Sequence, residues 1–173
     1  MSDWLKFLFL GIASVIFGVI ALGNTVAASL AVAIMTGALF LVVGVIQIWG
    51  GMTTKAMENR LLTIMMGILA ALLGASFLYN PLEGAVSLAL LILILMGLGG
   101  IIRIIMAWSM RASPLFWAML LSGALSVLLA GYIWSYFAEI STSLLGILLG
   151  IELIFNGAGL VVMGLFLRAK TKG

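Results

Sequence analysis

Cysteine and histidine are both absent from this 173-residue sequence. Without cysteine the chain can form neither a disulfide nor a thiolate metal site. Without histidine it lacks the commonest proton shuttle, and it can contain neither a Ser–His dyad nor the HExxH motif of zinc proteases. The few acidic residues form no catalytic pair. We therefore predict that the protein is not an enzyme and that it has no catalytic residues, no metal site and no cofactor.

Charge is also scarce, because only 8% of the residues are charged whereas 65% are hydrophobic. The apolar runs are long enough to cross a bilayer, which takes ~20 residues for ~30 Å of hydrocarbon. We predict an all-α integral membrane protein whose principal partner is the lipid bilayer, with no soluble domain. The six predicted spans are Leu5–Gly23, Ala27–Gly51, Leu61–Tyr79, Gly84–Trp108, Leu115–Trp134 and Thr142–Leu167.

The sequence repeats itself at an offset of 56 residues. The windows GIASVIFG, GILAALLG and GALSVLLA begin at Gly11, Gly67 and Gly123, and Asn24 aligns with Asn80. The second half of each unit aligns less strongly, through Gly44, Gly100 and Asn156, and through Gln47, Arg103 and Gly159. The chain is thus predicted to consist of three two-helix hairpin repeats, at about 5–55, 61–111 and 115–167, within a single six-helix domain spanning 1–173.

Each predicted repeat contains an even number of spans, so all three enter and leave the membrane on the same side. Repeats of this kind are related by rotation about the membrane normal. We expect a compact pseudo-threefold bundle of six helices.

Basic residues are confined to the termini and to alternate connections, apart from one arginine within a span. Those outside the spans or close to their ends are Lys6, Lys55, Arg60, Arg111, Arg168, Lys170 and Lys172. The positive-inside rule then predicts that both termini are cytoplasmic. The net charge of +3 reflects this sorting, and we predict no binding of nucleic acid.

The opposite side of the membrane carries two acids, Glu83 and Glu139. Carboxyl groups in water become neutral as the pH falls through about 4, so these are candidate titrating acids on the outer face. The segment from Asn80 through Pro81 to Glu83 is typical of a capped helix start. Ser141 is predicted to cap the sixth helix in a similar way.

Glu152 is the sharpest local signal, because it lies ~10 residues into the sixth span and therefore ~15 Å deep. Asn156 follows one turn later on the same face. These two residues are a candidate intramembrane polar site. The alternative is a neutral Glu152 that hydrogen-bonds Asn156 or a neighbouring helix and only stabilises packing. The aligned positions in the other repeats are Phe40 and Met96, so the acid is confined to the third repeat.

Arg103 is a candidate interface cation near the cytoplasmic end of the fourth span. An axial gap of ~13 Å separates it from Glu152, which argues against an ion pair. We expect its side chain to extend toward the cytoplasmic headgroups.

Repeat two, from Gly67 through Asn80-Pro81 to Gly100 and Arg103, resembles the HdeD-like acid-resistance membrane protein family. The resemblance covers nearly the whole chain, but Asn24-Thr25 and Tyr136-Phe137 depart from the Asn-Pro turn. It implies a non-enzymatic inner-membrane protein that helps bacteria to survive acid, and it supplies no catalytic residues.

A second hypothesis is a small transporter or channel with a polar site at Glu152 and Asn156. The spans lack the paired Gly/Pro-broken helices that mark many transporter sites. Small residues, as in Gly146-xxx-Gly150, predict close helix packing within the bundle, and they are also compatible with a homo-oligomer or with another membrane protein as partner.

Overall fold

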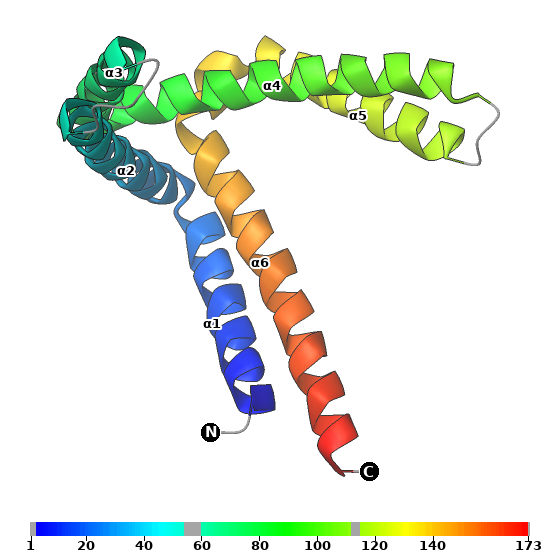
Figure 1. Cartoon of the computed structure of the whole chain (residues 1–173). Coiled ribbons are helices and arrows are strands. Elements are labelled where there is room, and N and C mark those ends of the chain that lie inside the picture. Colours follow the sequence, from blue (N-terminus) through cyan, green and yellow to red (C-terminus); the bar gives the residue numbers. More distant parts are fainter. Residues whose placement is uncertain (1–2, 54–59, 112–114, 173) are drawn as a thin grey trace. The chain divides into compact units, whose positions relative to one another are not determined.

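The computed structural model describes residues 3–53, 60–111 and 115–172. Its elements are α1 (Asp3–Gly23), α2 (Thr25–Thr53), α3 (Arg60–Tyr79), α4 (Pro81–Ser109), α5 (Phe116–Ser135) and α6 (Phe137–Lys172), as Figure 1 shows. All six helices are long and apolar enough to cross a membrane. This confirms the predicted all-α fold with six membrane-length helices.

The predicted start of the sixth helix is wrong. α6 begins at Phe137, so Ser141 lies in its second turn and is only 4% exposed. Ser141 is therefore not a cap. The polar residues around it resemble a loop in the sequence, yet the first turns of a helix accept such residues because their N–H groups lack partners within the helix.

A single residue separates the two helices at each of three junctions, namely Asn24, Asn80 and Tyr136. The N–H of Asn24 donates to the Ile20 carbonyl at 3.1 Å, and its own carbonyl accepts from the N–H of Ala28 at 3.0 Å. The corresponding bonds of Asn80 are 2.9 and 3.0 Å long. Each junction residue thus continues the backbone hydrogen bonding of both helices, and the three junctions keep the spacing of the repeat.

Close packing joins the second helix of one repeat to the first helix of the next. A Cβ on Gly67 of α3 would lie 2.9 Å from the carbonyl oxygen of Gly44 in α2, and one on Gly123 of α5 would lie 2.9 Å from that of Gly100 in α4. Both distances are too short for a side chain, so these helices touch through their backbones. The sequence predicted the repeat but not this choice of partners.

The last helix packs against the first in the same manner. A Cβ on Gly157 of α6 would lie 2.7 Å from the carbonyl oxygen of Gly11 in α1. Figure 1 shows α1 and α6 side by side. Because Gly11 is the repeat equivalent of Gly67 and Gly123, the α6/α1 pair corresponds to α2/α3 and α4/α5.

The third repeat contains one extra residue before this contact. A constant offset places Asn156 at the position of Gly44 and Gly100, whereas the structure places Gly157 there. Gly150 likewise faces Gly18, as Gly37 faces Gly74. The predicted alignment of α6 is therefore wrong by one residue, because an apolar background conceals a single insertion.

The chain forms two compact units, one comprising 1–85 and 143–173 and the other 86–142. The first contains the α2/α3 and α1/α6 contacts, and the second contains the α4/α5 contact. The single six-helix domain and the pseudo-threefold arrangement remain predictions.

Buried side chains are mostly small in both units. Ala33, Ala89 and Ala107 are completely buried, whereas Leu128 is 71% exposed. This distribution is opposite to that of a soluble core and suits helices whose outer surfaces face lipid.

Candidate functional site

Glu152 and Asn156 lie on the face of α6 that is turned away from α1. Gly150 and Gly157 are buried against α1, whereas Glu152 and Asn156 are exposed. The described membrane span of α6 runs over residues 137–168, so Glu152 lies at its middle. Both side chains thus share one exposed face of α6, and their depth in the membrane stays a prediction from the sequence.

Neither side chain is satisfied by the residues that the structure describes. Among the side chains that the structure describes, over 4–53, 60–111 and 115–168, those of Glu152 and Asn156 take part in no hydrogen bond or ion pair. The bond between Glu152 and Asn156 that would make them simple packing residues is absent from this part of the chain. A carboxyl in hydrocarbon is unfavourable unless it meets a polar partner or water.

The corrected register changes which residues correspond to Glu152. With the extra residue of the third repeat, its equivalents are Leu39 and Leu95 rather than Phe40 and Met96. Leu39 is 64% exposed and Leu95 is 60% exposed. The open face of α6 thus differs chemically from the same face in α2 and α4.

Arg103 lies beside the α4/α5 contact. Its Nη1 donates to the Ser126 Oγ at 3.5 Å, and Ser126 in turn donates to the Ser122 carbonyl at 2.9 Å. The Arg103 Cβ lies where it would contact a side chain at Gly123. Arg103 is exposed, and its extension toward the cytoplasmic headgroups stays a prediction.

Gln47 occupies the position of Arg103 in the α2/α3 pair. Its Cβ would lie 3.0 Å from a Cβ on Gly67. The Oε1 atom is buried and accepts no hydrogen bond from the residues that the structure describes. A buried acceptor without a donor is destabilising. Sequence comparison identified this position as polar in two repeats but could not show that the oxygen is unsatisfied.

The two outer acids lie in the first turns of helices that follow a junction. Glu83 is in the first turn of α4 and Glu139 in that of α6. The side-chain amide of Asn80 donates to Glu83 Oε2 at 3.5 Å, which links the junction residue to the first turn of α4; the predicted cap stays a prediction. A negative charge at this end of a helix is favourable because the unpaired N–H groups leave partial positive charge there.

Ser29 and Gly146 form a polar contact that sequence reasoning missed. The backbone N–H of Gly146 in α6 donates to the Ser29 Oγ of α2 at 2.8 Å, and Ser29 is completely buried. A Cβ on Gly146 would collide with the backbone of Thr25. The Gly146-xxx-Gly150 pattern indicated close packing, but nothing in the sequence pointed to Ser29 as its partner.

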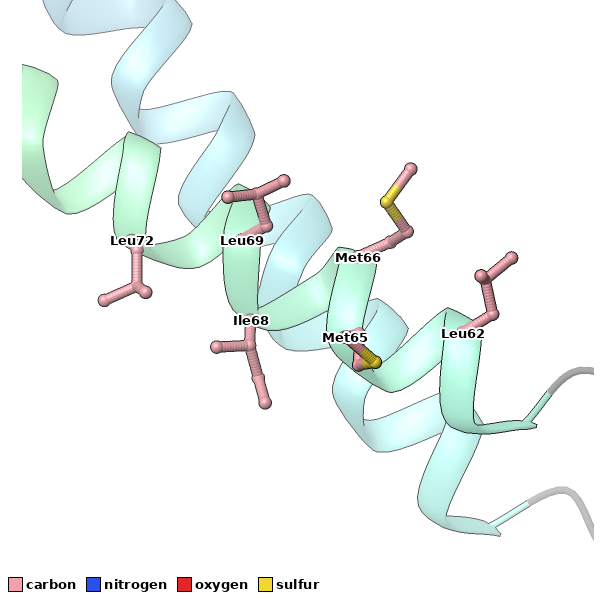
Figure 2. A pocket seen from close by; sticks show the side chains of 6 residues that line it. All are labelled: Leu62, Met65, Met66, Ile68, Leu69 and Leu72. Carbon is pink, nitrogen blue, oxygen red and sulfur yellow. The ribbon is translucent and has the colours of Figure 1, made fainter.

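The described surface includes five open grooves lined mainly by apolar side chains, although Asn24 borders one of them and Asn80 and Glu83 border another. The best defined, of about 390 Å³, is formed by one face of α3, as Figure 2 shows; its lining residues are Leu62, Met65, Met66, Ile68, Leu69 and Leu72. Neither Glu152 nor Asn156 lines any of these five grooves. Among the described residues no group of acidic side chains is arranged to hold a metal ion. These grooves suit lipid tails or apolar helices rather than a polar solute.

Comparison with known families finds the repeat independently. The family described as a short repeat of unknown function, DUF308, matches residues 9–79 and, a second time, residues 65–135. The two matches are displaced by the offset of the repeat, and together they cover more than half of the chain. No curated protein and no solved structure matches the chain.

Proposed function

Because the chain belongs to the DUF308 family, we propose that this multi-pass membrane protein helps a bacterial cell to survive acid without catalysing a reaction. DUF308 is the family to which HdeD proteins belong. The single observation that carries the proposal is the double family match, together with the HdeD-like sequence of repeat two. The proposed location is the bacterial inner membrane. Both termini are proposed to lie in the cytoplasm, on the basis of the distribution of Lys and Arg.

The outer acids give the proposal a physical basis. Glu83 and Glu139 are exposed in the first turns of α4 and α6, next to the junctions at Asn80 and Tyr136. When external acid neutralises a carboxylate at such a position, its favourable interaction with the helix terminus is lost. We propose that this loss changes the packing of the junction or a contact with another membrane component.

A non-enzymatic role is supported by the chemistry of the chain. Histidine and cysteine are absent from its sequence, and the acids Glu83, Glu139 and Glu152 are far apart along it. A transporter or channel around Glu152 and Asn156 lacks comparable support, because neither residue lines any of the five grooves described above.

The experiment is survival of a deletion strain after a strong acid challenge at high cell density. The native gene is compared with the double variant Glu83→Gln/Glu139→Gln and with Glu152→Gln, at equal membrane abundance. We expect full rescue by the native gene and reduced rescue by the outer double variant. Full survival of the deletion strain itself would contradict the acid-stress role.

The variants separate the two sets of acids. Rescue by Glu152→Gln equal to that by the native gene would remove ionisation of Glu152 from the mechanism. If rescue were lost with Glu152→Gln but not with the outer double variant, the acid response would depend on the carboxyl of Glu152 and not on those of Glu83 and Glu139.

A further inference from the structure

On the open face of α6 the third repeat is polar where its equivalents are mainly apolar. In α2 this face carries Leu39, Val43 and Ile46, in α4 Leu95, Gly99 and Ile102, and in α6 Glu152, Asn156 and Gly159. The equivalents Ile46 and Ile102 are 63% and 55% exposed. Such residues suit hydrocarbon, but Glu152 and Asn156 do not. Something other than lipid tails must therefore cover this face of α6.

The side chains described over 4–53, 60–111 and 115–168 form no ion pair with Glu152. Arg103 is the cation deepest within a described span, and it lies six residues from the end of α4, where it bonds Ser126. Glu152, in contrast, lies at the middle of its span. A partner for Glu152 must instead provide neutral donors and acceptors.

The face provides these groups itself. In its neutral form the carboxyl of Glu152 both donates and accepts, and so does the amide of Asn156. The two residues are one turn apart, or ~6 Å along the axis. If two parallel copies of α6 meet about a twofold axis along the membrane normal, each Glu152 lies within reach of Asn156 of the partner.

Gly159 completes this arrangement. A Cβ built on Gly159 meets no atom within 4 Å, so its backbone is open to an approaching helix. The helix pairs within this chain meet at glycines such as Gly44 and Gly67. Close backbone approach strengthens hydrogen bonds and packing between helices in a membrane.

We propose that the Glu152/Asn156/Gly159 face of α6 binds the same face of a second copy of this chain. The resulting homodimer is isologous, with two Glu152–Asn156 pairs across the α6/α6 contact. The proposed acid-stress role does not depend on this dimer contact, so an experiment can contradict one proposal and leave the other intact.

The natural absence of cysteine makes the test direct. A single-cysteine variant Met163→Cys places a thiol three turns beyond Glu152 on the same face. Met65→Cys is the matched control, since Met65 is 59% exposed and Met163 is 48% exposed, and Met65 stands on the outer face of α3 (Figure 2). Both full-length variants are oxidised in native membranes, and dimers are measured on denaturing gels.

We expect a disulfide-linked dimer from Met163→Cys and monomer from Met65→Cys at equal abundance. Adding Glu152→Leu should lower the dimer yield by roughly fivefold, because interhelical hydrogen bonds are lost, whereas Glu152→Gln should preserve it. Equal yields from the two cysteines would indicate random collision and overturn the proposal. So would monomeric Met163→Cys whose thiol still reacts with a maleimide, because that result would mean that the thiol is accessible and that no second copy of the chain lies against it.

Discussion

The carbonyl oxygen of Gly11 lies 2.7 Å from the position that a Cβ on Gly157 would take, so the first and last helices touch through their backbones. Equivalent contacts join α2 to α3 and α4 to α5. In those two pairs the partners are neighbours in the chain. In the α1/α6 pair the two helices are not neighbours in the chain. Disrupting this contact therefore tests whether the first and last helices pack together.

Replacement of Gly157 by valine should destabilise the protein by about 1–3 kcal/mol, the usual effect of overpacking. Gly131→Val is the matched control, because Gly131 also lies within a helix, α5, and a Cβ built on it meets nothing within 4 Å. The measurement is unfolding in mild detergent with increasing denaturing detergent. Equal effects of the two variants would mean that α1 does not pack on α6 as described.

Ser29→Ala should destabilise the protein by about 1 kcal/mol, because the Gly146 N–H loses a buried acceptor at 2.8 Å. Ser135→Ala serves as control, since the Ser135 hydroxyl is exposed and donates only to the Gly131 carbonyl of its own helix at 3.0 Å. The same unfolding assay applies. If Ser135→Ala had the larger effect, the contact between α2 and α6 would not contribute to stability.

Gln47→Leu should leave stability unchanged or raise it by about 1 kcal/mol, because it removes the buried Oε1 atom that has no donor among the described residues. Gln47→Glu, which has nearly the same shape, should be clearly destabilising because it places a charge at this position. A marked loss of stability in Gln47→Leu would reveal a donor for Oε1 outside the described residues.

The predicted orientation can be tested with single cysteines, which the native sequence does not contain. Tyr136→Cys lies at a junction, and Ser109→Cys lies at the other end of the α4/α5 pair. A membrane-impermeant maleimide should label Tyr136→Cys in cells with a permeabilised outer membrane and Ser109→Cys only after lysis. The reverse pattern would place both termini outside the cytoplasm.

The sequence predicted the helices well because span length and the repeat are both strong signals. The windows that begin at Gly11, Gly67 and Gly123 identified the glycines at which helices meet. Their partners could not be predicted, because a glycine that permits close approach does not specify which backbone approaches. The pairing of α2 with α3 rather than with α1 emerged only from the structure.

The candidate site was predicted in part. The depth of Glu152 and its shared face with Asn156 follow from counting residues along a helix. The one-residue insertion before Gly150 could not be found, because the background of apolar residues around the glycines conceals the shift. Ser29 and the unsatisfied oxygen of Gln47 depend on tertiary contacts and leave no pattern in the sequence.

The single-residue junctions at Asn24, Asn80 and Tyr136 have a practical consequence. Because consecutive spans alternate in direction, all three junctions lie on the same side of the membrane. A protease needs several extended residues to bind a cleavage site, and an epitope tag needs a connection that tolerates insertion. Neither exists at these junctions, so the chain should resist proteolysis from that side and accept inserted tags only from the other.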